Sequence, residues 1–163
     1  MSEETKQNYG PVKEFLESAV EAKIDAARLK RRVAELESRC QKTTTQMGDG
    51  AGGGNADSQE LWALLADEIE REKAAQRSAL EQYRTVETFI AHLSRPTHRA
   101  ILRLRYLEGL GWIKVQQELY KQGIFYSERH ISRLHNFALD EALVLWRKGG
   151  PWENELTENE EMT

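Results

Sequence analysis

The residues best suited to chemistry in this 163-residue chain lie between positions 127 and 136. Ile131, Leu134 and Ala138 recur at helical spacing and predict the inward face of a helix that Ser127 caps. Glu128, Arg129, Ser132, Arg133 and Asn136 then face outward, with His130 at the edge of this face. The face mixes the forked donors of arginine with an amide and a hydroxyl. These groups suit the donors and acceptors on base edges in a major groove, so the pattern predicts a DNA-reading face.

The predicted helix also offers groups for the DNA backbone. Arg129 and Arg133 are one turn apart and can reach guanine edges or phosphates, and the N–H groups of the first turn, after Ser127, are open to a phosphate. Further basic residues upstream are candidates for backbone contacts: Arg99, Arg103, Arg105, Lys114 and Lys121. On an isolated helix two arginines are more often ordinary surface charges, and their place in a basic block favours the functional interpretation.

That basic block is hidden by the net charge of the whole chain, which is −4. Residues 94–148 carry ten Lys or Arg and five Asp or Glu, a net charge of +5, whereas residues 149–163 carry five Glu and no basic residue. The charge is therefore distributed as expected for a DNA-binding segment followed by an acidic tail.

Other kinds of chemistry find little support in the sequence. His130 and His135 are five positions apart and do not share a helix face for a metal, and no spacing matches a catalytic triad or paired carboxylates. The Gly-rich stretch after position 47 lacks the Lys-Ser/Thr of a phosphate loop. Cys40 cannot form an internal disulfide, and no signal peptide or membrane span is recognisable. We expect a cytoplasmic protein without catalytic residues, metal or cofactor.

Two long helices are predicted upstream of the basic block. Apolar or small residues recur in steps of four and three from Phe15 to Cys40, and a second seam runs from Trp62 to Leu93, with Glu72 and Gln76 as polar interruptions. We predict a disordered segment at 1–10 and a coiled-coil-like hairpin over 11–93 with a Gly-rich loop at 43–58. Phe15 would lie near Ile90. Pairing of the same seams between two chains, giving a homodimer, is the alternative, and both pairings can hold at once.

Three shorter helices are predicted over 94–148. Ser94 and Pro96 mark the start of the first, Gly109 and Gly111 end it, Trp112 opens the second, and Ser127 caps the third, which stops at a Gly-Gly-Pro sequence. The last two form a helix-turn-helix. The expected fold class is all-α, with the hairpin followed by this domain and a disordered acidic tail at 149–163.

Residues 101–112 and 126–135 are similar to region 4 of sigma-70-type factors: an arginine-rich helix, a glycine-containing turn, an aromatic residue opening the scaffold helix, and a Ser-capped recognition helix. The whole chain resembles the phage and prophage late-operon transcription regulators of the ArpU/RinA type, specifically over 99–139 and in layout alone before that. One departure is the 15 positions from Trp112 to Ser127, which lengthen either the scaffold helix or the turn at 122–125.

This resemblance implies a sequence-specific transcription regulator that binds double-stranded promoter DNA, with RNA polymerase as a candidate partner and no membrane contact. Two alternatives stay open on the residues alone. A phage DNA-packaging protein, like a small terminase subunit, also combines a helix-turn-helix with oligomerising helices. The second alternative is a protein-interaction module that keeps the helix-turn-helix only as a scaffold.

Overall fold

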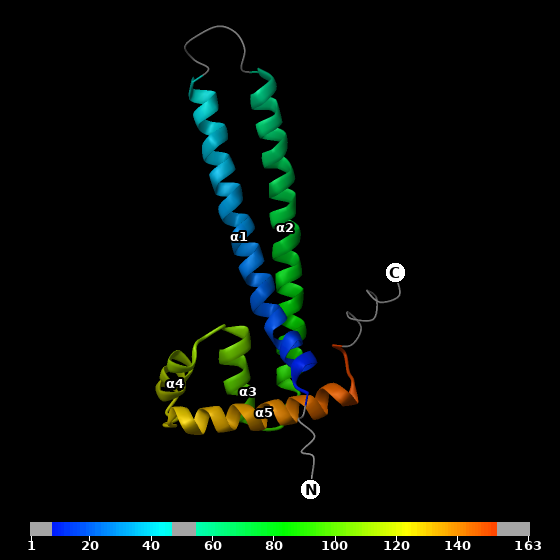
Figure 1. Cartoon of the computed structure of the whole chain (residues 1–163), viewed down its shortest axis with the longest axis vertical. Coiled ribbons are helices and arrows are strands. Elements are labelled where there is room, and N and C mark those ends of the chain that lie inside the picture. Colours follow the sequence, from blue (N-terminus) through cyan, green and yellow to red (C-terminus); the bar gives the residue numbers. More distant parts are fainter. Residues whose placement is uncertain (1–7, 47–54, 153–163) are drawn as a thin grey trace. The chain divides into compact units, whose positions relative to one another are not determined.

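The protein is all-α, as predicted. A computed structural model describes residues 8–46 and 55–152, and every regular element in these ranges is helical (Figure 1). The chain forms two compact units, residues 21–81 and residues 1–20 with 82–163, and each is considered by itself. The elements are α1 (Gly10–Gln46), α2 (Asn55–Ala91), α3 (Pro96–Leu102), η2 (Arg103–Leu107), α4 (Trp112–Lys121) and α5 (Glu128–Lys148).

In the unit of residues 21–81, α1 and α2 lie side by side and antiparallel (Figure 1). Their shared core contains Val33, Leu36, Cys40 and Leu65, so the predicted pairing of the two seams is confirmed there. The predicted seam of α2 is rotated at its start, because Leu61 packs on this core whereas the Trp62 side chain is 49% exposed. Leu65 and Ile69 of the predicted seam do pack on this core, and Leu61, Leu65 and Glu68 follow one another in steps of four and three.

Glu68 is the polar residue that enters this core, where the sequence predicted Glu72 and Gln76. It is 3% exposed. Its carboxylate lies 3.4 Å from the Arg32 guanidinium on α1 and 3.2 Å from that of Arg71 on α2. A buried charge contributes little net stability, and its best-attested use is to fix the register of paired helices.

The connection between the two long helices is shorter than predicted. α1 continues to Gln46 and α2 begins at Asn55, so both ends of the predicted 43–58 loop are helical. Thr43, Thr44 and Thr45 lie in the last turns of α1, where each hydroxyl donates to the carbonyl four residues earlier, at 2.9 Å. The glycine-rich part, 47–54, lies outside the described residues.

The second unit is organised around a cluster of aromatic rings. The Phe89 ring of α2 is fully buried and contacts Phe15 of α1, Trp146 of α5 and Trp152, with ring centroids 5.2, 6.1 and 5.0 Å away. Phe15 and Ile90 share this core, as predicted. Around the rings pack the apolar residues of α5, from Ala138 to Leu143.

Both ends of the described chain are more ordered than predicted. Trp152, expected in the disordered tail, is 3% exposed because its ring fills the space beside Phe89. At the other end, α1 begins at Gly10 and the Tyr9 hydroxyl hydrogen-bonds to the Asp140 carboxylate. The rest of the predicted disordered segments, 1–7 and 153–163, lies outside the described residues. Within the described ranges, no helix is long and apolar enough to cross a membrane.

The three shorter predicted helices are present, with two local differences. α3 begins at Pro96, but the Ser94 side chain does not cap it, because its hydroxyl hydrogen-bonds to Glu141 instead. The end of the same helix widens into η2, a π-helical turn in which the Glu108 N–H donates to the Arg103 carbonyl at 3.0 Å. Gly109, at φ +69°, then ends the helix, as predicted.

Candidate nucleic-acid interface

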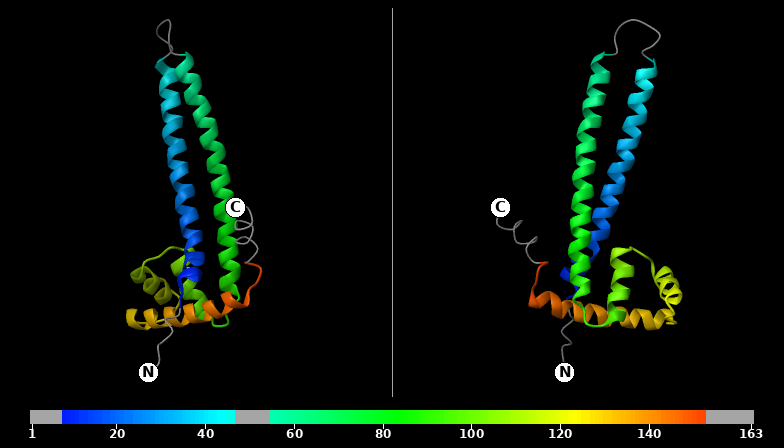
Figure 2. Two further views of the ribbon diagram at one scale, coloured as in Figure 1. Left: turned by 45° about the vertical axis from the view of Figure 1, so that its right-hand side comes forward. Right: turned by 180° about the vertical axis from the view of Figure 1, so that it is seen from behind.

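α4 and the first turns of α5 form a helix-turn-helix that packs on α3 and η2 (Figures 1 and 2). The small core of this arrangement contains Val115 and Leu119 from α4, Ile131 from α5, and Ile101 and Leu104 from the preceding helix. Burial of these residues fixes one face of α5 inward and therefore determines which side chains it presents outside.

The turn between α4 and α5 accounts for the unusual spacing from Trp112 to Ser127. α4 ends at Lys121, so the extra length lies in a six-residue connection, 122–127. Gly123 reverses the chain at φ +83°, a conformation that side chains rarely adopt. The connection is held to α4 by two hydrogen bonds of 2.9 Å, from the Ile124 N–H to the Leu119 carbonyl and from the Gln116 amide to the Tyr126 carbonyl.

The predicted outward face of α5 is exposed. Ser127 caps the helix, since its hydroxyl accepts from the His130 N–H at 3.2 Å. All seven predicted residues of the face are exposed: Ser127, Glu128, Arg129, His130, Ser132, Arg133 and Asn136. Neither Arg129 nor Arg133 has an ion-pair partner among the described residues, so both guanidinium groups remain available to an external ligand.

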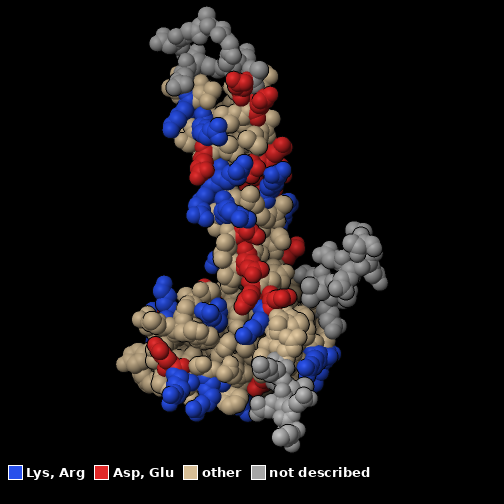
Figure 3. Space-filling view, in the orientation of Figure 1, with Lys and Arg blue, Asp and Glu red and all other residues tan. Residues whose placement is uncertain are grey.

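A surface hollow of about 400 Å³ brings part of this face together. Its walls are Phe125, Tyr126, Ser127, Arg129, His130 and Arg133. The Tyr126 and His130 rings meet edge to face, with centroids 4.6 Å apart, which holds the imidazole against the turn. The N-terminus of α5 favours an anion, although the His130 N–H is already bonded to Ser127 and Glu128 carries a negative charge there. Figure 3 shows basic side chains along α5, interrupted by acidic ones.

The upstream basic candidates fall into two groups. Arg105 is half-buried, donates to the Leu110 carbonyl at 2.9 Å and lies 4.7 Å above the Trp112 ring, so it supports the turn before α4. Arg103 pairs with Glu87 at 3.3 Å, and Lys121 pairs with Glu118 at 2.7 Å. Lys114, by contrast, is exposed without an ion pair to any described residue. Of the upstream candidates, Lys114 is therefore the one most available to a phosphate.

A buried histidine that sequence reasoning considered only as a metal ligand helps to position α5. His135 is 8% exposed, and its Nε2 lies 2.9 Å from the Tyr106 hydroxyl of η2. Burial, with help from the nearby charges of Lys13 and Arg105, lowers the pKa of His135 to about 4, so the ring is neutral near pH 7. The spacing of Ile131, His135 and Ala138 in steps of four and three could have revealed this inward position.

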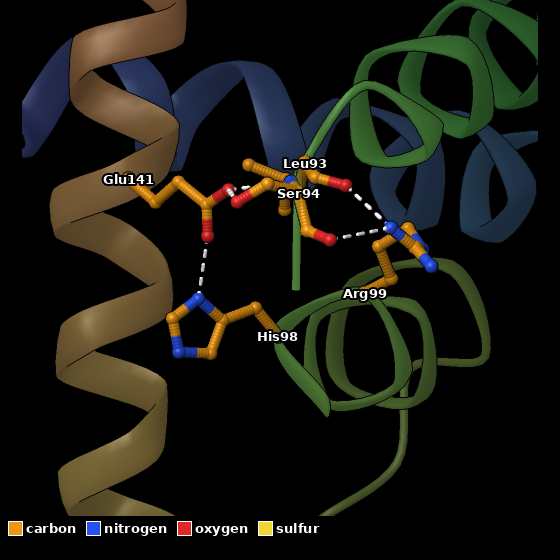
Figure 4. A network of polar contacts seen from close by, with 5 residues as sticks. All are labelled: Leu93, Ser94, His98, Arg99 and Glu141. Carbon is orange, nitrogen blue, oxygen red and sulfur yellow. Dashed lines mark hydrogen bonds and ion pairs between the residues drawn. The ribbon is translucent and has the colours of Figure 1, made fainter. Parts of the chain in front are cut away.

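Glu141 of α5 connects the helix to the segment that precedes α3 (Figure 4). Its carboxylate accepts from the Ser94 N–H at 2.5 Å and the Ser94 hydroxyl at 2.6 Å, and it lies 2.6 Å from Nδ1 of the buried His98. Burial alone would raise the pKa of Glu141, but the hydrogen bonds from Ser94 and His98 outweigh it and hold the pKa below its usual value. No periodicity in the sequence marks this network.

Arg99 completes the same connection from the other side (Figure 4). Its guanidinium donates to the Leu93 carbonyl at 2.6 Å and to the Ser94 carbonyl at 3.2 Å. The short link between α2 and α3 is thus held by side chains of both α3 and α5. Arg99 therefore has a structural role and is not free to contact a nucleic acid without breaking these bonds.

Comparisons of the chain with protein-family models, with curated proteins and with solved structures found no match.

Proposed function

We propose that this chain is a sequence-specific DNA-binding transcription regulator of the sigma-70 region-4-like kind, encoded by a phage or prophage. In this proposal the N-terminal part of α5 lies in the major groove of promoter DNA. Arg129, Arg133 and Asn136 contact base edges, and the capped first turn at Ser127 approaches a phosphate. The proposal assigns the chain no catalytic step, metal or cofactor.

The observation that carries the proposal is a difference among the five arginines between positions 99 and 133. Arg99, Arg103 and Arg105 are engaged within the protein, by backbone carbonyls, a carboxylate or an aromatic ring. Arg129 and Arg133 are exposed in one hollow, without an ion pair to a described residue. Two unpaired guanidinium groups that share one hollow on a helix are suited to an anionic partner, which would accept charge-assisted hydrogen bonds from both.

Two parts of the proposal rest on the resemblance to sigma region 4 and to the ArpU/RinA-type regulators. These are the phage or prophage origin and RNA polymerase as a partner. A homodimer through the N-terminal helices stays a prediction as well. Light scattering of the purified chain measures its oligomeric state, and a ring of many subunits would favour the DNA-packaging alternative.

Selection from a random duplex pool tests the DNA-binding proposal directly. The wild-type protein should enrich one related group of duplexes, and footprinting should show protection of a short major-groove site. The Arg129→Ala/Arg133→Ala variant should lose the preference for those duplexes, because each bidentate arginine–base contact contributes about 1–3 kcal/mol of discrimination. A pool without enrichment, together with an unchanged promoter reporter for the double variant, would refute the proposal.

The matched control removes two arginines elsewhere. Arg28 and Arg31 are exposed residues of α1, in the other unit, and Arg28 pairs only with its neighbour Asp25 among the described residues. The Arg28→Ala/Arg31→Ala variant has the same net charge as the test variant. It should retain the selected preference, so a loss confined to Arg129 and Arg133 reports the site and not the overall charge.

A further inference from the structure

An exposed pair of aromatic rings borders the basic hollow of α5. The Phe125 and Tyr120 side chains are 69% and 64% exposed, and their rings meet edge to face with centroids 4.6 Å apart. Large apolar side chains gathered on a surface mark interaction sites more often than single ones do. Phe125 is also only two residues before Ser127, the cap of α5.

The lengthened turn presents Phe125 in a fixed direction. Ile124 and Tyr126 are partly buried against the core of the helix-turn-helix, whereas Phe125, between them, points outward. Backbone and side-chain hydrogen bonds hold both neighbours to α4. A ring held in place on both sides loses little conformational entropy when it meets a ligand, which favours a recognition role.

The surroundings of Phe125 indicate what that ligand is. Phe125 and Tyr126 line two adjoining hollows: the basic one with Arg129 and Arg133, and an apolar one of about 550 Å³. The apolar hollow is completed by Gln116, Gln117, Tyr120, Lys121 and Ile124. An apolar ring beside two unpaired guanidinium groups is complementary to a surface that carries an apolar group among acceptor atoms and phosphates. The major groove at a thymine has this composition, since its C5-methyl group projects beside acceptors of neighbouring bases.

We propose that Phe125, supported by Tyr120, contacts a thymine methyl group in the major groove and so determines specificity at a position next to those read by Arg129 and Arg133. This inference rests on the proposed DNA-binding function and names a chemical feature of its target. A single methyl group moved from water to an apolar contact corresponds to about a fourfold change in affinity.

Single replacements of thymine by deoxyuridine test the inference, because they remove the methyl group and leave every base-pairing atom in place. The probe is the duplex that wild-type protein selects from a random pool, and fluorescence anisotropy gives Kd for each replacement. We expect one position, or two adjacent ones, at which the loss of the methyl group weakens wild-type binding about fourfold. Phe125→Ala should bind the thymine duplex more weakly and should no longer distinguish thymine from deoxyuridine there.

Ile113→Ala is the matched control. Ile113 is an exposed apolar residue of α4, 64% exposed, and lines neither hollow. This variant should keep the discrimination of the wild type. Because Phe125 is largely exposed, Phe125→Ala should also keep the thermal unfolding curve of the wild type.

Different results separate this inference from the proposed function. If no duplex is enriched, both the proposed function and the role of Phe125 are overturned. If the wild type binds the selected duplex equally well after every replacement of thymine, only the role of Phe125 is overturned. A selected site that contains no thymine would have the same consequence. Retention of the methyl discrimination by Phe125→Ala would do the same, because another residue would then contact the methyl group.

Discussion

Acidification should destabilise the unit that carries α5, because His135 is buried in its neutral form. The folded protein lowers the pKa of His135 to about 4, mainly through burial, whereas the ordinary value is 6.5. A depressed histidine pKa means that the unfolded chain binds the proton first. The stability associated with the neutral ring is therefore complete above about pH 6.5 and is lost as the pH falls toward 4.

The size of the effect follows from the two pKa values. Between pH 7.5 and pH 5.0, linkage with values of 6.5 and about 4 gives a loss of about 2 kcal/mol in the free energy of unfolding. The side chain retains a little solvent exposure, 8%, so the expected loss lies between about 1 and 2 kcal/mol. Glu141 changes stability in the same direction but at lower pH, because its pKa lies below the ordinary value of 4.5 and its contribution is lost only as the pH falls below that value.

Comparison with His135→Gln separates the histidine from the other titrating groups. Glutamine does not titrate and can still hydrogen-bond to the Tyr106 hydroxyl, the partner of His135 at 2.9 Å. Urea unfolding at pH 7.5 and 5.0 gives the free energy of unfolding of both proteins, and an NMR titration of the imidazole gives the folded-state pKa of His135. The wild type should lose about 1 to 2 kcal/mol more than the variant on acidification. Equal losses, or a titration midpoint at 6.5 or above, would refute the reasoning.

Substitutions at three positions test other contacts of the same unit by urea unfolding at neutral pH. Phe89→Ala should cost about 3–5 kcal/mol, because a fully buried ring with three aromatic neighbours is removed; a cost below about 1 kcal/mol would contradict the aromatic core. Ser127→Ala should cost about 1 kcal/mol and Ser127→Asp close to nothing, whereas equal costs would argue against capping of α5. Glu141→Gln should cost about 1–3 kcal/mol, because an uncharged amide replaces the carboxylate that accepts from Ser94 and His98, and an unchanged stability would show that these bonds are not needed.

The elements of this fold could be predicted where local patterns decide them. The heptad steps from Phe15 to Cys40 predicted α1, and Pro96, Trp112 and Ser127 marked the starts of the three later helices. The exposed face of α5 was also predictable, because the inward residues at helical spacing leave only one side for the polar ones.

The remaining features depend on contacts between residues far apart in the chain. Glu141 and Ser94 are 47 positions apart, and neither belongs to a repeating pattern. Trp152 follows a Gly-Gly-Pro sequence that is typical of a disordered tail, and only the space beside Phe89 gives it a buried place. The structural role of Arg105 was equally hidden, because sequence alone does not distinguish an arginine stacked on Trp112 from one that is free for DNA.

The central claim is that the exposed face of α5 binds double-stranded DNA, and a salt series of anisotropy titrations tests it most directly. The selected duplex and an unrelated duplex of equal length are each titrated with the wild type, with Arg129→Ala/Arg133→Ala, and with Arg28→Ala/Arg31→Ala. Each phosphate contact contributes a log–log slope of about −0.9, so we predict a slope of roughly −3 to −6 for the wild type and the control, with preference for the selected duplex. The test variant should lose that preference. Absence of wild-type binding at low salt, or an identical preference in all three proteins, would contradict the claim.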